Sequence, residues 1–206
     1  MAQNDIRDET FKKKMIFKNK KILVTGGTGS LGQRLVERIL SNELGQPKKV
    51  IIFSRDESKQ HDMRVKWLNT SKKSDSIIFN NFKRVLEFRI GDIRRYDDIL
   101  ASAKDVDIIV NAAALKHVPV CEYFPEQAIL TNCIGAINLT KCISDHNLNV
   151  ETVVGISTDK ASSPINVMGM TKAIQERILV ASNIFLKKTK ILNVRYGNVI
   201  ASRGSV

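Results

Sequence analysis

Short apolar runs alternate with longer stretches of helical periodicity along most of the chain. The runs are rich in β-branched residues and short enough for buried strands, whereas the stretches between them carry apolar residues three and four positions apart. We expect strands at 22–24, 48–54, 85–90, 107–110, 152–156 and 190–199. We expect helices at 33–43, 56–68 and 126–145, and another that starts at about 166. This alternation is typical of an α/β protein with a doubly wound parallel sheet and helices on both faces, the Rossmann architecture.

Two segments fall outside the alternation. Residues 1–19 are polar and charged, so we expect an N-terminal arm or short helix before a main domain at 20–206. Residues 71–83 are interpreted as a polar insert between a helix and a strand. With 206 residues and 43% hydrophobic content, the chain has enough apolar residues for about one domain.

A glycine-rich turn joins the first strand to the first helix. It reads as Gly27-x-Gly29-x-x-Gly32 and equally as Gly26-x-x-Gly29-x-x-Gly32. Glycines in this context permit a tight turn and a close approach of a pyrophosphate to the backbone, while N–H groups at the helix start bind its phosphates. A turn without a ligand is the alternative. The residues that we expect to bind the cofactor here are Gly26, Thr28, Gly29, Ser30, Leu31 and Gly32.

Polar residues at the end of the second strand bear on the choice of cofactor. NAD-binding units usually place an acidic residue there for the ribose 2′-hydroxyl. This chain has Ser54 and Arg55 there, followed by Lys59, and such a group is a better receptor for a 2′-phosphate. The pattern favours NADP over NAD. Asp56 could serve NAD or cap the helix that it precedes, so it stays a candidate.

The ends of the third and fourth strands supply further candidates. Asp92, followed by Ile93, could bind the adenine amino group of a cofactor or cap the next turn. Lys116 could meet a phosphate or a sugar hydroxyl, and His117 could act in binding or be structural. Small residues that let a cofactor lie against the backbone follow the fourth strand, at Ala112, Ala113 and Ala114.

The fifth strand ends in groups suited to acid–base chemistry. They are a hydroxyl, a carboxylate and an ammonium at the edge where open α/β sheets bind ligands, carried by Thr158, Asp159 and Lys160. A turn in which these side chains only cap backbone groups is the alternative. Met168 and Lys172 lie on one face of the next helix, four residues apart, and Asn198 lies near the end of the last strand.

Charge and composition narrow the classes of partner. The net charge is +12, but the lysines are scattered beside turns and helix ends without interleaved aromatics, which favours a solvated surface over nucleic-acid binding. No apolar run has the length of a membrane helix or the character of a signal peptide, so we expect a cytoplasmic protein without a membrane partner. The spacing of Cys121, Cys133 and Cys142 indicates reduced, structural thiols, with neither a disulfide nor a metal site.

Taken together, the motifs TGGTGSLG, GDI, NAAALKHVP, STDKASSPINVMGMTK and VRYGNVIASRGSV resemble the extended short-chain dehydrogenase/reductases. SRDESKQ and the STDKA block are similar, more narrowly, to the polysaccharide-biosynthesis UDP-N-acetylglucosamine 4,6-dehydratase group. The resemblance covers about residues 17–206. It implies a Rossmann fold, bound NADP and conversion of a UDP-sugar to a 4-keto-6-deoxy product.

The resemblance also implies roles for single residues. Lys160 is implied as the base that removes the C5 proton, and Asp159 as the acid for the hydroxide that leaves C6. Thr158 would hydrogen-bond the sugar near O4, and Lys172 would hold the nicotinamide ribose. Further contacts with the substrate are implied for Lys116 and Asn198.

The chain departs from the resembled pattern in two ways. Met168 stands where the superfamily has its catalytic tyrosine, although some members of the dehydratase group are similar in carrying Met there, including ones that invert C5. The relatives continue past the GSV block, so we expect a C-terminally truncated chain that lacks most of the substrate domain. The resemblance implies a dimer through helices at about 126–145 and 166–186. A UDP-sugar 4-epimerase and a non-catalytic NADP-binding protein are the alternatives.

Overall fold

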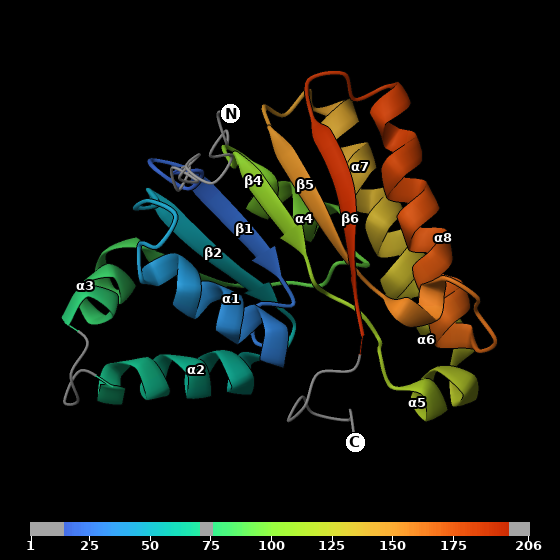
Figure 1. The fold of residues 1–206 in the computed structure, drawn as a ribbon, viewed down its shortest axis with the longest axis horizontal. Coiled ribbons are helices and arrows are strands. Elements are labelled where there is room, and N and C mark those ends of the chain that lie inside the picture. The colour runs from blue at the N-terminus through green and yellow to red at the C-terminus, as the bar shows by residue number, and fades with distance from the viewer. Residues whose placement is uncertain (1–14, 71–75, 198–206) are drawn as a thin grey trace, which may run out of the picture.

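Six parallel strands form one sheet with helices on both of its faces (Figure 1). The computed structural model describes residues 15–70 and 76–197. The strand order is β3-β2-β1-β4-β5-β6, and every neighbouring pair is parallel. The strands are β1 (Lys21–Thr25), β2 (Lys49–Ser54), β3 (Leu86–Ile90), β4 (Ile108–Asn111), β5 (Thr152–Thr158) and β6 (Lys190–Tyr196).

The helices divide between the two faces. In chain order they are α1 (Ser30–Leu40), α2 (Glu57–Thr70), α3 (Ser76–Val85), α4 (Tyr96–Ala103), α5 (Val118–Tyr123), α6 (Pro125–Ala128), α7 (Gly135–Asp145) and α8 (Val167–Ala181). A π-helical turn η1 (Ile129–Ile134) joins α6 to α7, and short 3₁₀ turns η2 (Asp159–Ala161) and η3 (Ser182–Ile184) flank α8. Helices α1, α2 and α3 cover one face of the sheet, and α4, α7 and α8 cover the other.

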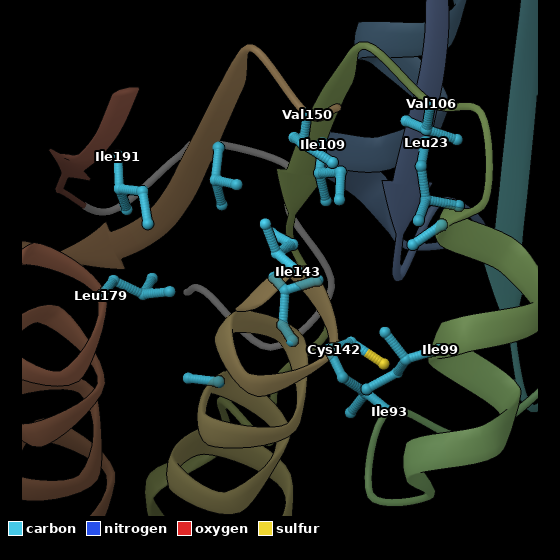
Figure 2. Close-up of a cluster of buried hydrophobic side chains, with 14 of the residues drawn as sticks. Leu23, Ile93, Ile99, Val106, Ile109, Cys142, Ile143, Val150, Leu179 and Ile191 are labelled. Atoms are coloured by element: carbon cyan, nitrogen blue, oxygen red, sulfur yellow. The ribbon is translucent and has the colours of Figure 1, made fainter. Parts of the chain in front are cut away.

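Alternation along the strands builds two apolar layers. Ile22 and Val24 of β1 pack under α1 to α3, while Leu23 between them packs under α4, α7 and α8. Figure 2 shows the second layer, in which Ile109 of β4 lies over Ile143 of α7. Because both faces are covered, the central strands β1, β2 and β4 are almost wholly buried, which is why short apolar runs identified them.

The structure corrects several boundaries. A helix, α3, occupies most of the segment predicted as a polar insert, and Phe82 and Val85 of it are buried under the sheet. Helix α1 begins at Ser30, three residues before the predicted start at 33, because the helix follows the glycine turn without a spacer. Strand β5 continues to Thr158, two residues beyond the prediction. The predicted helix at 126–145 is helical throughout but contains η1.

The strand order reverses between β1 and β4. The chain runs outward from β1 to β3, and then crosses back to β4 on the other side of β1. Ligands of open α/β sheets bind at the carboxyl ends of the strands beside such a reversal. Of the predicted arm, Phe17 packs against the layer under α1 to α3, and residues 1–14 lie outside the described residues. Across the described ranges, no helix has both the length and the apolarity to cross a bilayer.

Candidate nucleotide-binding and catalytic site

The glycine turn is shaped by contacts within the chain. Gly26 has a φ of +65°, and a Cβ on it would stand 2.7 Å from the Ala112 carbonyl oxygen. A Cβ on Gly32 would stand 2.6 Å from the Cα of Gly27, so the first turn of α1 presses against the loop. Among the two glycine patterns, Gly26-x-x-Gly29-x-x-Gly32 therefore has the residue that requires the left-handed conformation at its first position.

The N-terminus of α1 is open to solvent. Gly29, Ser30 and Leu31 are exposed, and the N-cap Gly29 brings no side-chain oxygen to the first N–H groups of the helix. Those N–H groups have no acceptor within the helix. Thr28 is buried, and its carbonyl oxygen accepts a hydrogen bond from Gln33 Nε2 at 2.9 Å. The arrangement leaves a positive helix end available to an anion such as a pyrophosphate.

The predicted 2′-phosphate receptor is only partly free. Ser54 is buried, and its Oγ accepts a hydrogen bond from Gln60 Nε2 at 3.1 Å. Asp56 caps α2, since its Oδ1 accepts from the Lys59 backbone N–H at 3.0 Å, and the Lys59 ammonium pairs with the same carboxylate at 2.6 Å. This capping is one of the two roles expected of Asp56. Arg55 keeps half of its side chain exposed at the end of β2.

Asp92 at the end of β3 is held by a cation. Its Oδ1 accepts from the Arg94 backbone N–H at 3.0 Å and its Oδ2 accepts from the Arg94 guanidinium, while Arg55 lies 3.7 Å away. Burial opposes ionisation of this carboxyl, but the bonds from Arg94 outweigh it and lower the pKa of Asp92. Asp92 thus caps the turn that follows it, which is one of the two roles expected of this residue. Ile93 turns its side chain into the apolar layer, so only its backbone faces the site.

Small residues line the reversal between β1 and β4. Thr25 Oγ1 donates to Asn111 Oδ1 at 2.7 Å and accepts from the Ala113 N–H at 3.2 Å, which ties the two strand ends together. Ala112, Ala113 and Ala114 are partly exposed, and a ligand could contact their backbone. Lys116 and His117 are both exposed just before α5.

An asparagine that the sequence analysis did not identify fixes the segment after β4. Asn132 of η1 is buried, and its side chain accepts from the Leu115 N–H at 2.9 Å and donates to the Leu115 carbonyl at 3.0 Å. Its amide also donates to Thr171 Oγ1 of α8 at 3.0 Å. Asn132 therefore connects the loop that carries Lys116 to the helix that carries Lys172.

Thr158, Asp159 and Lys160 form a compact hydrogen-bonded group at the end of β5. Asp159 Oδ1 accepts from Thr158 Oγ1 at 2.8 Å and from the Lys160 N–H at 2.9 Å, and the Lys160 ammonium lies 3.3 Å away. The Thr158 hydroxyl and the adjacent ammonium lower the pKa of Asp159. The side chains of Asp159 and Lys160 are 56% and 35% exposed, so this charged pair faces outward.

Helix α8 carries two candidate residues with different surroundings. Met168 is buried in a small apolar cluster with Cys121 and Ala128, so it packs the helix and presents no polar group to the site. Lys172 is also buried, and its ammonium donates to the Ile156 carbonyl at 2.5 Å and to Gln175 Oε1 at 2.8 Å. Burial lowers the pKa of Lys172 to about 8.

A second ion pair joins α8 to the end of β6. The Arg195 guanidinium donates two hydrogen bonds to the Glu176 carboxylate, from Nε to Oε1 at 2.8 Å and from Nη2 to Oε2 at 2.6 Å. The Arg195 guanidinium lowers the pKa of Glu176. Neither Glu176 nor Gln175 was predicted as a site residue from the sequence, although each lies about one helical turn after Lys172. Asn198 lies outside the described residues.

Comparison with known proteins places this site in a family. The model of the family described as polysaccharide biosynthesis protein matches residues 22–206. A Rickettsia bellii (strain OSU 85-389) protein named UDP-glucose 4-epimerase is 45% identical over 195 residues, which are 93% of this chain and 52% of that protein. The chain spans about half the length of the curated relatives it matches.

Solved structures share the fold. The X-ray structure of Pen from Bacillus thuringiensis superposes with a TM-score of 0.78 at 35% identity, covering 92% of this chain and 53% of that one. DesIV from Streptomyces venezuelae, a dTDP-glucose 4,6-dehydratase solved with NAD and TYD bound, gives a TM-score of 0.64 at 24% identity, covering 84% and 55%. Because this one family model matches residues 22–206, the chain belongs to the polysaccharide biosynthesis protein family.

Proposed function

We propose that the chain is the cofactor-binding and catalytic part of an NADP-dependent nucleotide-sugar 4,6-dehydratase, acting on UDP-N-acetylglucosamine or a similar UDP-sugar. The observation that carries the proposal is the Thr158–Asp159–Lys160 group, where a carboxylate and an amine lie 3.3 Å apart at the carboxyl end of β5, the strand next to β4. Elimination of water from a sugar needs one base and one acid at neighbouring carbons, and this pair can supply both.

The residues present fit a nicotinamide dinucleotide. The uncapped N-terminus of α1 suits the pyrophosphate, and the tight turn at Gly26 leaves no room for a side chain between the loop and Ala112. The exposed Arg55 guanidinium suits a 2′-phosphate, which is the support for NADP. When bound, the nicotinamide would take a hydride from C4 of the sugar and return it at C6.

The resting pair must exchange a proton before it can act. Asp159 rests as a carboxylate with the Lys160 ammonium beside it, whereas a C5 base must be a neutral amine and an acid must carry a proton. Transfer of one proton from Lys160 to Asp159 creates both forms at once. Lys160 then takes the C5 proton, Asp159 gives its proton to the departing C6 hydroxyl, and water leaves. When the hydride arrives at C6, Lys160 returns a proton to C5 and then takes up a proton from solvent, which restores the resting charges of both residues.

The buried Met168 separates the two sugar chemistries. A 4-epimerase of the resembled superfamily uses a tyrosine at this position to move the O4 proton, and methionine has no proton to move. In a dehydratase of the resembled group, Thr158 would hydrogen-bond O4 and pass the O4 proton to solvent, because Asp159, to which its hydroxyl donates at 2.8 Å, takes its proton from Lys160. The second candidate is a UDP-sugar 4-epimerase, which the name of the 45% identical Rickettsia relative favours.

One experiment distinguishes these two candidates. The chain, and a longer natural form that includes it, are incubated with UDP-N-acetylglucosamine and NADP in heavy water, followed by mass spectrometry and NMR of the nucleotide sugar. Dehydration gives loss of one water with deuterium at C5. Epimerisation gives an unchanged mass and inversion at C4. If the longer form produces neither change, the dehydratase proposal is wrong for this substrate class.

We also propose that the protein forms a dimer through α7 and α8. Apolar side chains on the outer side of these helices are 40 to 51% exposed, at Ile137, Met170, Ile174 and Val180. Isolated exposed apolar residues are ordinary, but a group on two adjacent helices is typical of an interface. Light scattering should give twice the chain mass, and Ile174→Lys should return the monomer.

A further inference from the structure

The ammonium of Lys172 has two partners, and one of them comes from its own helix. Gln175 lies one turn after Lys172 on α8 and is fully buried. Its Oε1 accepts from the ammonium at 2.8 Å, while its Nε2 donates to the Ile156 carbonyl at 3.3 Å. The ammonium donates to the same carbonyl at 2.5 Å. Lysine, glutamine and strand carbonyl thus form a closed triangle at the carboxyl-terminal half of β5.

The elements around this triangle supply few charges. Glu176 on α8 and Cys133 on η1 are the titratable groups that act on Lys172, and Glu176 is already paired with Arg195 of β6. On η2, Asp159 and Lys160 pair with each other. Because no carboxylate bonds the buried ammonium directly in the described triangle, neutral oxygens hold it, and one of these belongs to Gln175.

We propose that Gln175 is a positioning residue, which holds the Lys172 ammonium against the Ile156 carbonyl and keeps it charged beside the nicotinamide ribose. The position of Lys172 beside the ribose rests on the proposed function, whereas the hydrogen bond from its ammonium to Gln175 does not. Burial destabilises the charged form of the ammonium, and hydrogen bonds to acceptors offset this cost. Removing the amide oxygen of Gln175 should therefore destabilise the charged form, and replacing the amide with a carboxylate should stabilise it.

Two substitutions test this in opposite directions. Gln175→Met keeps the volume and removes the acceptor, and it should move the Lys172 titration to lower pH by about one unit, equal to a tenfold weaker hold on the proton. Gln175→Glu supplies a charged acceptor and should move the titration to higher pH. NMR of lysine side chains labelled at Cε follows the titration, and Lys172→Met identifies the signal.

Controls separate positioning from general stability. Ser182→Ala removes a partly buried hydrogen bond at the end of α8, from Ser182 Oγ to the Ile178 carbonyl, and should leave the Lys172 titration in place. Gln175→Asn, which withdraws the amide by one methylene, takes the place of the Met variant if that variant fails to fold. Circular dichroism melts report folding for each protein.

NADPH binding, measured by its fluorescence at pH 7 and pH 8.5, tests the link to the cofactor. From pH 7 to pH 8.5, the loss of NADPH affinity should be several-fold larger in Gln175→Met than in the parent. In Gln175→Glu the loss should be smaller than in the parent. If Lys172 titrates alike in the parent, Met and Glu proteins, the positioning role is refuted. If the titrations move as expected but neither the parent nor the variants bind NADPH, the role of Gln175 holds and the cofactor proposal fails.

Discussion

Substitution of Lys172 by methionine should remove a dependence of stability on pH. Burial lowers the pKa of Lys172 from its ordinary value of 10.5 to about 8 in the folded chain. Between these two pH values the unfolded chain holds the lysine proton and the folded chain does not. Stability therefore rises with pH across this window, and below it the group contributes no slope. The Lys172→Met protein lacks this rise.

The size of the effect follows from the two pKa values. Linkage with pKa values of about 8 and about 10.5 gives a gain in unfolding free energy of about 2 kcal/mol between pH 7 and pH 9.5. Urea unfolding of both proteins at the two pH values measures the gain, since the thiols and phenols that also titrate there are common to both. Lys188→Met, which removes an exposed lysine, controls for the loss of one charge.

The comparison has a clear negative outcome. If the difference in unfolding free energy between the parent and Lys172→Met is the same at both pH values, the ammonium is not desolvated in the folded chain. Gln175 then holds no desolvated charge, and its positioning role is refuted as well. A difference that grows towards high pH in favour of the parent supports the buried geometry.

Three further predictions concern the surrounding site. Gly26→Ala forces a Cβ to within 2.7 Å of the Ala112 carbonyl at a φ of +65°, and thermal unfolding should show a loss of at least about 1–2 kcal/mol. Asn132→Ala removes both hydrogen bonds to Leu115 and should lower the free energy of urea unfolding by about 2 kcal/mol. Asn132→Asp should also be less stable than the parent, because a carboxylate can accept from the Leu115 N–H but cannot donate to the Leu115 carbonyl. Arg55→Gln should weaken NADP binding about tenfold by calorimetry and leave NAD binding unchanged, which is the pattern of a 2′-phosphate contact.

Strand positions were predictable because both faces of the sheet are covered. Residues such as Val24 and Ile52 are fully buried, so the central strands β1 and β2 appear as nearly continuous apolar runs. The glycine turn was predictable for a local reason, since Gly26 must adopt a left-handed conformation within a few residues of the helix start. Since β1, β4 and β5 are parallel, their carboxyl ends lie at one edge of the sheet, and the candidate residues follow these ends.

The missed features depend on contacts between distant residues. Asn132 bonds Leu115, 17 residues earlier, and Gln175 bonds Ile156, 19 residues earlier, so no local period identifies either one. Helix α3 was missed because charged and polar residues dominate the segment before it, and its burial depends on packing against the sheet through Phe82. The pairing of Asp92 with Arg94 is local, two residues apart, and could have been predicted.

The two lysines near the end of β5 are suited to different tasks. Lys172 is buried and held by neutral oxygens, so its position is fixed. Lys160 is paired with Asp159 at the surface, and in water such a pair favours its charged form, which is inactive as base and acid. Exclusion of water destabilises the charged forms of Asp159 and Lys160 and so lowers the free energy needed to form the neutral pair. A bound sugar that covers Asp159 and Lys160 would therefore create the catalytic forms by its own binding, which ties dehydration to a substrate large enough to shield both side chains.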